Sequence, residues 1–542
     1  MQLIYSFTVA LFLTIALIPL LIRFSGQMQL LDSPDDDRKI HDRIIPRSGG
    51  LAIVLGVFLP LLFLLPIEHE FEGLLWGAAT IVVFGYLDDR FELDYKWKFL
   101  GQMLAVTAAI NGGVLISEVP LMGRDDAPLW VALPLTFFFL LGATNAVNLS
   151  DGLDGLAAGT SLLSLALIAA FALMQQNYSI ALVSLTVIGG LLGFLRYNTF
   201  PARIFMGDAG SQFLGYIVAC LAVLVTQSDT GPISPVLPLL ILGLPILDTL
   251  SVMTIRIKEK RSPFSPDKNH LHHQLMSIGL KHYQAVGAIY TILAALLISA
   301  YLFRYESDLF LLMFYAIFSL LVIGSLYLCY RKKSSNNNIN TENGVRDRRN
   351  QLLRKLSWVY LYSATIIECM VGAIMLGTAF FINNVSEDFA KTSMFTIAGL
   401  LVLFFVTKSN RLIVARACGY IVSAFVVYLF TTSDVEQDIR MIVNSVFFAL
   451  VITLMLSIRM TRKEEFRLDT QDLLVLFLVL VVPQLPLKTL DSNDIGIISL
   501  QLAALMYSCE FILNKAKSHF NVLIFSSIIS LLIVALPTVA NI

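Results

Sequence analysis

Carboxylates, amides and glycines gather at the end of an apolar stretch, in the segment Asn145-Ala-Val-Asn148-Leu-Ser-Asp151-Gly-Leu-Asp154-Gly. An aspartate at the centre of a lipid-facing helix would cost about 2.5–3.5 kcal/mol even on the gentler insertion scales, so these side chains must face water, a metal or a substrate. Hard oxygen ligands suit Mg²⁺, with Mn²⁺ as the alternative, where substrate phosphates complete the coordination. The segment therefore predicts a hydrated, metal-binding site at one face of a membrane.

Further acids end or begin other apolar stretches, at Asp88, Asp89, Asp208 and Asp248. Adjacent acids such as Asp88 and Asp89 could, taken alone, be solvated loop charges. Asp208 lies between glycines, which let backbone N–H groups approach an anion at a helix N-terminus, although the same letters also form an ordinary helix cap. Several such acids together favour one shared site over separate surface charges.

Three of the chain's seven histidines, His270, His272 and His273, lie within a few residues of one another and follow Arg261 and Lys268. No cysteine or HExxH pattern accompanies them, which argues against zinc. Imidazole and cationic groups suit a pyrophosphate instead, because they can donate hydrogen bonds to its non-bridging oxygens during transfer. The alternative is a basic loop with incidental histidines.

Basic residues also precede the second apolar stretch, at Lys39, His41 and Arg47. They would suit the phosphate of a lipid at the membrane face. They are explained equally well as signals that fix the orientation of the first helices. Both interpretations stay open at the level of sequence.

The composition is that of a polytopic membrane protein. Hydrophobic residues make up 57% and charged residues 14% of the 542 residues, and the mean hydropathy is +0.76. The net charge of −1 gives no indication of a nucleic-acid partner. The five cysteines lie in apolar segments without CxxC spacing, so they are expected to be packing residues.

Apolar runs long enough to cross a bilayer predict an all-α, polytopic helical bundle with about 11 spans in a core and about 7 in a C-terminal extension. The first group lies near residues 4–23, 49–66, 73–87, 99–117, 129–148, 155–175, 178–195, 211–227, 234–255, 284–303 and 308–330. A polar segment, 334–355, reads as a linker. We therefore expect a membrane domain at 1–333 and a second multi-span domain at 356–542.

Lys and Arg residues concentrate in alternate loops, which predicts the orientation of the chain. The loops that follow the first, third, seventh and ninth spans are basic, whereas the loops that follow the even-numbered spans of this group hold only Arg124 and Arg304. Because basic loops mark the cytoplasmic side, the N-terminus is expected outside. All of the polar motifs then fall on the cytoplasmic face.

Four segments carry a family resemblance: NAVNLSDGLDGLAAG, FMGDAGS, YLDDRFELDYKWK and SPFSPDKNHLHH. They resemble signature segments of the polyprenyl-phosphate N-acetylhexosamine-1-phosphate transferases, and the histidine segment is similar to that of the WecA-like branch. The resemblance covers about residues 1–333. It implies a multi-pass protein of the bacterial inner membrane that binds Mg²⁺.

The resemblance also implies a reaction. N-acetylglucosamine-1-phosphate would pass from UDP-GlcNAc to undecaprenyl phosphate, releasing UMP, as the first lipid-linked step of a cell-surface polysaccharide such as lipopolysaccharide O-antigen or a cell-wall polymer. The same reaction with another UDP-N-acetyl amino sugar, or with UDP-MurNAc-pentapeptide as in the MraY branch, stays open. A homodimer, the number of chemical steps and the downstream polymer are left open too.

The resemblance assigns roles to particular positions. The catalytic residues it implies are Asp88, Asp89, Asp208, His270, His272 and His273. The metal ligands it implies are Asp208, Asn148 and Asp89. The substrate-binding residues it implies are Lys39, His41, Arg47, Lys98, Asn148, Asp151, Asp154 and Arg261.

Two other classes of protein share single features with this sequence. The segment from Asp88 to Glu92 is similar to the acid pairs of membrane prenyltransferases of the UbiA type, which would not explain the other three segments. A transporter would place ionisable groups near the middle of the bilayer. The acids of residues 1–333 lie at span ends instead, but Glu368 and Arg416 lie inside apolar stretches of the extension, which has no assigned role.

Overall fold

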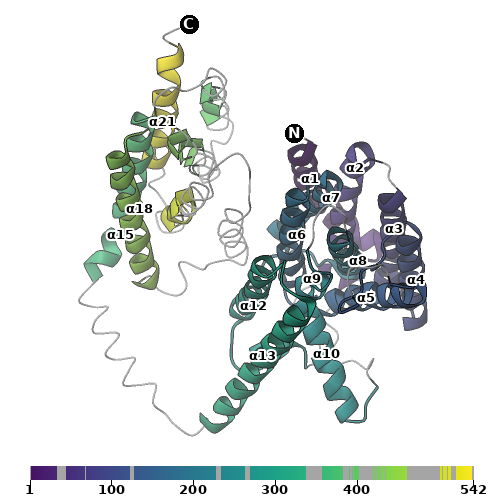
Figure 1. Ribbon diagram of the computed structural model, residues 1–542. Coiled ribbons are helices and arrows are strands. Elements are labelled where there is room, and N and C mark those ends of the chain that lie inside the picture. The colour runs from purple at the N-terminus through teal and green to yellow at the C-terminus, as the bar shows by residue number, and fades with distance from the viewer. Residues whose placement is uncertain are drawn as a thin grey trace. The chain divides into compact units, whose positions relative to one another are not determined.

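Figure 1 shows a computed structural model of the chain. In its N-terminal part, residues 2–32, 44–66, 69–122, 127–227, 233–262 and 269–336 are described. In the C-terminal part they are 357–382, 437–460 and 521–539, with shorter stretches between 390 and 513. The chain divides near residue 337 into two compact units, each with its own hydrophobic core. Most of the predicted linker lies outside the described residues.

The first unit is a bundle of α-helices joined by short connections. Its helices are α1 (Gln2–Met28), α2 (Gly49–Leu64), α3 (His69–Phe91), α4 (Tyr95–Asn111), α5 (Leu129–Leu149), α6 (Leu156–Met174), α7 (Tyr178–Asn198), α8 (Gly207–Thr226), α9 (Leu237–Ile241), α10 (Gly243–Lys258), α11 (Leu271–Ser277), α12 (His282–Leu302) and α13 (Asp308–Asn336). One short antiparallel pair, β1 (Leu31–Asp32) with β2 (Ile45–Pro46), links α1 to α2. Over the described part of the chain, nine helices are long and apolar enough to cross a membrane. The predicted all-α, polytopic membrane fold is confirmed.

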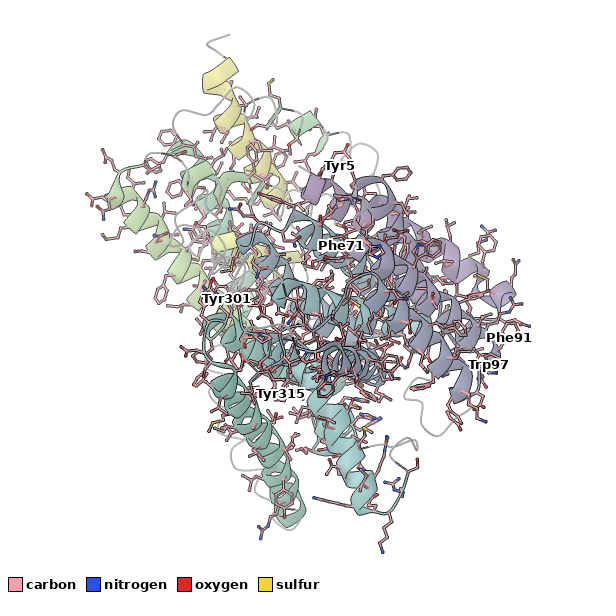
Figure 2. The ribbon with its side chains drawn as sticks, turned by 45° about the vertical axis from the view of Figure 1, so that its right-hand side comes forward. Tyr5, Phe71, Phe91, Trp97, Tyr301 and Tyr315 are labelled. Atoms are coloured by element: carbon pink, nitrogen blue, oxygen red, sulfur yellow. The ribbon has the colours of Figure 1, made fainter. Side chains whose placement is uncertain are left out.

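The outer surface of this unit is apolar, as a lipid-facing surface must be. Phe91 and Trp97 lie at its outer edge in Figure 2, and their side chains are 58% and 57% exposed. Phe71 on the same helix as Phe91 points into the bundle and is buried. Large exposed apolar surfaces are unusual for a water-soluble protein. Here they agree with helices that satisfy their backbone hydrogen bonds internally and face hydrocarbon.

Helix α8 is the central element of the first unit. It contacts α2, α3, α5, α6, α7 and α9, and all of its residues from Ala209 to Thr226 are buried. Glycines on two neighbouring helices allow this packing at its first turn. A Cβ on Gly50 of α2 would lie 2.3 Å from the backbone nitrogen of Gly210, and a Cβ on Gly85 of α3 would lie 2.5 Å from the Cα of Ala209.

The predicted ninth span is the one clear departure from a continuous helix. Instead of one helix at 234–255, the chain forms α9 and α10 with a break at Leu242. Pro245 has no N–H, so it cannot bond the carbonyl of Ile241 as the helix would require. The hydroxyl of Ser164 on α6 donates to that carbonyl at 2.8 Å. The expectation of an unbroken span was wrong, because it weighed apolar length and not the proline.

Helix ends gather at one end of the bundle. The chain leaves α3 and enters α4, leaves α5 and enters α6, and leaves α7 and enters α8 through short connections on the same side. Successive helices joined this way run in opposite directions. The polar segments predicted from sequence therefore meet at one end of the first unit.

The second unit has its own helical core. Its longer described helices are α15 (Ser357–Phe380), α18 (Gln437–Met460) and α21 (Asn521–Val539), and α15 contacts both of the others. Glu368, singled out from sequence, lies on α15 and is buried. Arg416, the other charged residue singled out in the extension, lies outside the described residues.

A substitution at Gly85 tests the close approach of α3 and α8. Gly85→Ala would force the two backbones apart, and overpacking of this kind typically costs about 1–3 kcal/mol. We expect a lower thermal unfolding temperature in detergent. Gly142→Ala on α5 is the matched control, because nothing lies within 4 Å of its added Cβ. Equal losses for the two variants would contradict the packing described here.

Candidate active site

The N-terminus of α8 is capped by an acid from another helix. Asp89, in the last turn of α3, accepts hydrogen bonds from the backbone N–H groups of Asp208 and Ala209 at 2.8 and 3.0 Å. Gly207 precedes them with φ +73, and a Cβ there would lie 2.6 Å from a carboxylate oxygen of Asp89. Only glycine combines that backbone conformation with this approach. The glycine and the acid together fix where the Asp208 side chain begins.

Lys98 ties two of the predicted acids together. Its Nζ lies 2.5 Å from Oδ2 of Asp88 and 3.1 Å from Oδ2 of Asp208. The other oxygen of Asp88 accepts a hydrogen bond from the N–H of Leu93 at 2.9 Å. Asp88 is 5% exposed, whereas Lys98 and Asp208 are 36% and 31% exposed. One ammonium group thus offsets a buried carboxylate and a second carboxylate that remains accessible.

A layer of amides lies one helical turn below these charges. The side-chain amides of Gln102 on α4 and Asn145 on α5 form two hydrogen bonds, at 3.2 and 2.8 Å. Gln102 also donates to the side-chain oxygen of Gln212 on α8 at 2.9 Å. Gln102 and Gln212 are each less than 5% exposed. Since buried amides are costly unless they are paired, this network fixes α4, α5 and α8 relative to one another.

Asn148 faces Asp208 from the end of α5. Its side-chain oxygen accepts a hydrogen bond from the hydroxyl of Ser211 on α8 at 2.5 Å. The same hydroxyl oxygen lies 3.0 Å from the carbonyl oxygen of Gly207, so its single proton is shared between two acceptors. The two helix ends are therefore joined directly beside the Asp208 carboxylate.

The loop between α5 and α6 is held by side chains from later in the chain. Oδ2 of Asp154 accepts from the N–H of Ala202 at 2.9 Å, and the N–H of Asp154 donates to Nε2 of His282 at 3.1 Å. The ring of His282 stacks on Phe200, with centroids 4.4 Å apart. These contacts join the starts of α6 and α12 and the loop before α8.

Arg47 brings a positive charge to the same group of residues. Arg47 pairs with Asp32, its Nη2 lying 2.5 Å from Oδ1, and its N–H donates to the carbonyl of Leu30. Both residues adjoin the short β1–β2 pair, which aligns them. Arg47 is therefore fixed by both backbone and side chain.

These segments enclose a cavity of about 830 Å³. Its polar lining residues are Asp32, Arg47, Asp89, Asn148, Asp151, Asp154, Asn198, Arg203, Asp208, His273 and His282. Phe200 and Phe205 contribute aromatic surface. A cavity with more carboxylates than guanidinium groups and with aromatic walls has room for a phosphorylated ligand of substantial size.

Half of the residues predicted from sequence line this cavity. Those that line it are Arg47, Asp89, Asn148, Asp151, Asp154, Asp208 and His273. Asp88 and Lys98 do not line it, but Lys98 contacts Asp208 and links Asp88 to it, as described above. Arg261 instead bonds Glu259 with its Nε at 2.9 Å. Lys39 and His41 lie outside the described residues.

The three histidines of the motif do not occupy equivalent places. His273 reaches the cavity, whereas His270 and His272 are 6% and 4% exposed and lie behind it. Burial, with the neighbouring imidazoles of His273 and His270, lowers the pKa of His272 to about 3. His272 is therefore neutral at physiological pH and cannot act as a cation toward a phosphate.

Several lining residues were not predicted from sequence. They are Asp32, Asn198, Phe200, Arg203, Phe205 and His282. Asn198 is a structural support as well, since its side chain accepts from the N–H of Gly155 and donates to the carbonyl of Ile204. Asn198 and His282 lie at helix ends on the same predicted face as the acids, which is the signal that could have drawn attention to them. Phe200, Arg203 and Phe205 lie in the loop between α7 and α8, and Asp32 lies in β1.

Asp151 has an unusual electrostatic setting. It is open to the cavity, but the surrounding protein removes much of its solvation. That loss, followed by the charges of Asp208 and Asp154, raises the pKa of Asp151 from 3.8 to about 7. Because the cavity already holds enough negative charge to oppose ionisation of Asp151, a bound cation would be electrostatically favourable there.

The donor set fits a hard divalent cation. Carboxylate and amide oxygens of Asp89, Asn148 and Asp208 come together at the start of α8. Within the described residues, no three His, Cys, Asp or Glu side chains converge closely enough to hold an ion alone. Mg²⁺ is usually bound by one or two carboxylates, with waters and substrate phosphates supplying the rest.

Comparison with known proteins identifies similar chains. The model of glycosyl transferase family 4 matches residues 71–226, the segment that holds Asp88 to Asp208. The chain is 41% identical over 294 residues to a probable undecaprenyl-phosphate N-acetylglucosaminyl 1-phosphate transferase of Bacillus subtilis, across 54% of this chain and 82% of that protein.

More distant relatives carry related names. The chain is 34% identical over 286 residues to a decaprenyl-phosphate N-acetylglucosaminephosphotransferase of Mycobacterium tuberculosis, across 47% of this chain and 71% of that protein. It is 33% identical over 288 residues to an undecaprenyl-phosphate alpha-N-acetylglucosaminyl 1-phosphate transferase of Escherichia coli strain K12, across 51% and 77%.

The raised pKa of Asp151 predicts a pH-dependent stability. The folded protein holds this proton more tightly than the unfolded chain, so ionising Asp151 lowers stability as pH rises from 3.8 to about 7. We expect Asp151→Asn to raise the thermal unfolding temperature at pH 8. At pH 4 the same substitution should make little difference. A gain of equal size at both pH values would contradict the electrostatic origin.

Proposed function

The chain belongs to glycosyl transferase family 4, among the WecA-like polyprenyl-phosphate N-acetylhexosamine-1-phosphate transferases, and from that premise we propose its reaction. It transfers N-acetylglucosamine-1-phosphate from UDP-GlcNAc to undecaprenyl phosphate. The products are undecaprenyl-pyrophosphate-GlcNAc and UMP. We assign this activity to the first unit and assign no role to residues 356–542.

One observation carries the proposal beyond the family name. Asp208 stands at the exposed end of a wholly buried apolar helix, beside Lys98 and on a cavity that Asp89, Asn148, Asp151 and Asp154 also line. Placing carboxylates in an apolar helical bundle costs free energy, which favours a functional role for them. Carboxylate oxygens bind divalent cations that accompany phosphates. The arrangement argues against a transporter for this unit, because these groups lie at helix ends and not at mid-helix.

We place the two substrates on opposite sides of Asp208. The UDP-sugar would occupy the cavity, where Arg47, Arg203 and His273 can donate to phosphate oxygens and where Asp154 and Phe200 are both part of the lining. The acceptor phosphate would approach the Asp88–Lys98 pair, which contacts Asp208 from outside the cavity lining. Lys98 can then attract the acceptor phosphate while Asp88 orients the ammonium group.

The chemical step does not need a general base to deprotonate the acceptor phosphate. A phosphate monoester has a second pKa near 6 and is mostly dianionic at pH 7, so its oxygen is already a nucleophile. That oxygen forms a bond to the β-phosphorus of the donor. The bond from that phosphorus to the bridging oxygen breaks, and UMP leaves with the bridging oxygen and its electron pair. The side chains named above orient the two phosphates and offset their negative charge.

A two-step route remains the alternative. In it, a carboxylate such as Asp88 would first take the sugar phosphate, releasing UMP before the acceptor lipid attacks. Asp88 is buried and already bonded to Lys98 and Leu93, which favours an orienting role over a nucleophilic one. We therefore favour direct transfer between donor and acceptor.

Mg²⁺ is the proposed metal, with Mn²⁺ as a substitute. Asp208, Asn148 and Asp89 would hold it, and it would offset charge on the donor pyrophosphate. We also propose the bacterial cytoplasmic membrane as the location, with the N-terminus outside and the cavity at the cytoplasmic face. The basic loops on the side of the cavity support that orientation.

A donor-selection assay tests the proposed reaction. Purified protein with undecaprenyl phosphate and Mg²⁺ should release UMP from UDP-GlcNAc faster than from UDP-GalNAc or UDP-MurNAc-pentapeptide. Asp208→Asn should reduce the rate by at least about 100-fold, as when an electrostatic contribution to the transition state is lost. Preference for UDP-MurNAc-pentapeptide, or full activity in Asp208→Asn, would overturn the proposal.

Lys98 allows a test of the metal that does not depend on turnover. In Lys98→Met, Asp88 and Asp208 lose their shared counter-charge, so a cation should stabilise this variant more than wild type. We expect Mg²⁺ to raise the unfolding temperature of Lys98→Met by the larger amount. Lys96→Met is the matched control, since Lys96 lies over the ring of Tyr95 on the same helix. An identical response to Mg²⁺ in all three proteins would count against the metal site.

A further inference from the structure

Asp248 is a buried acid that the proposed chemistry does not use. It lies within α10 and is 9% exposed. One oxygen accepts from the backbone N–H of Leu271 at 2.7 Å, and the other lies 3.0 Å from Nδ1 of His270. A single carboxylate therefore bonds both the backbone and the first side chain of the histidine segment.

The position of these bonds on α11 gives them their significance. Helix α11 spans only Leu271–Ser277, and His270, at its N-cap, makes no side-chain capping bond of its own. The first N–H groups of a helix have no partner within the helix. Asp248 supplies one from α10, and its negative charge also interacts favourably with the helix dipole. It is thus an external cap for a helix too short to be stable by itself.

The rings of the motif connect this cap to the cavity. The rings of His270 and His272 are parallel within 10° at 5.9 Å, and the rings of His272 and His273 are 4.2 Å apart. His272 packs on the loop that follows α5, since a Cβ on Gly152 would lie 2.2 Å from its Nε2. His273, at the end of this row, lines the cavity.

The bond also fixes the state of the first ring. Carboxylate oxygens only accept hydrogen bonds, so Nδ1 of His270 carries the proton that it shares with Asp248. A carboxylate behind a histidine commonly fixes its tautomer and its ring orientation. Here the fixed ring stands at the base of α11 and aligns the two rings that follow it.

We propose that Asp248 is the positioning residue of the histidine segment: through His270 and the N-terminus of α11, it fixes His272 against Gly152 and sets His273 at the donor side of the cavity. The catalytic part of this inference rests on the proposed function. The structural part does not, because it concerns only how α11 is fixed. Loss of Asp248 should therefore affect the nucleotide-sugar donor and leave the acceptor lipid largely unaffected.

The test compares three variants. Asp248→Ala removes both bonds. Asp248→Asn keeps an acceptor for the N–H of Leu271, and its amide N–H can meet Nδ1 of His270 in the other tautomer. Asp308→Ala is the control, because Asp308 also bonds a side chain and a backbone N–H, those of Ser234 and Leu121. It lies beyond the far end of the 21-residue α12, about 30 Å from the cavity end.

Kinetics give the first measurement. We expect Asp248→Ala to lower kcat/KM for UDP-GlcNAc by about 10- to 100-fold, the range typical for loss of a residue that orients a functional histidine. The KM for undecaprenyl phosphate should stay near that of wild type. Asp248→Asn should recover most of the loss, and Asp308→Ala should retain wild-type kinetics. If the KM for undecaprenyl phosphate rose in Asp248→Ala as much as the KM for UDP-GlcNAc, Asp248 would contribute only general stability and the inference would be overturned.

Histidine modification gives a second measurement that needs no activity. With diethyl pyrocarbonate and mass spectrometry, His270 and His272 should react slowly in wild type compared with the exposed His69. In Asp248→Ala both should react faster, while in Asp308→Ala they should stay protected. Unchanged protection in Asp248→Ala would overturn the inference. If wild type releases no UMP from any donor, the proposed function fails, and this measurement still decides whether Asp248 positions the segment.

Discussion

The first unit depends on holding one carboxylate at the end of a helix that is buried along its whole length. Asp208 opens α8, and every residue after it on that helix is enclosed by other helices. Such a charge is tolerated only if it meets cations, hydrogen-bond donors or water. Asp89 takes up the free N–H groups of α8, Lys98 supplies a positive charge, and the cavity supplies access to solvent.

The rest of the architecture follows from that requirement. Close contacts at glycines bring α2 and α3 onto the first turn of α8, and the buried amides around Gln102 fix α4 and α5 beside it. The chain is interrupted at Leu242, between α9 and α10, where an unbroken helix would continue. Asp248 on α10 can then bond the histidine segment, which closes one side of the cavity. Rigid helix ends, and not long loops, thus carry the reacting groups.

The sequence alone predicted much of this arrangement. Apolar length located the helices of the first unit, and charged residues at their ends predicted a shared polar face. The break at Leu242 was missed because hydropathy does not register the hydrogen bond that Pro245 cannot make. Signature segments pointed to Asp89, Asn148, Asp151 and Asp154, which line the cavity. They could not reveal that His270 and His272 lie behind His273, because spacing in sequence does not give the direction of a side chain.

Residues such as Asn198, Arg203 and His282 were beyond sequence reasoning for a different reason. Asn198 and His282 lie at helix ends and Arg203 lies in the loop before α8. Each joins the cavity through tertiary contacts, as when His282 meets Phe200 and the backbone of Asp154. Lys39 and His41, predicted on basic charge, stay predictions. Sequence motifs therefore located the site, but which residues line it depends on tertiary packing.

The central claim is that the acids at the start of α8 hold one divalent cation. Crystals grown with Mn²⁺ and a UDP-sugar, measured at the manganese absorption edge, test it most directly. The account predicts a single strong anomalous peak within about 2.3 Å of a carboxylate oxygen of Asp208, a separation ordinary for a metal bound to hard oxygen ligands. A peak elsewhere in the first unit, or none at saturating Mn²⁺ with the nucleotide bound, would contradict it.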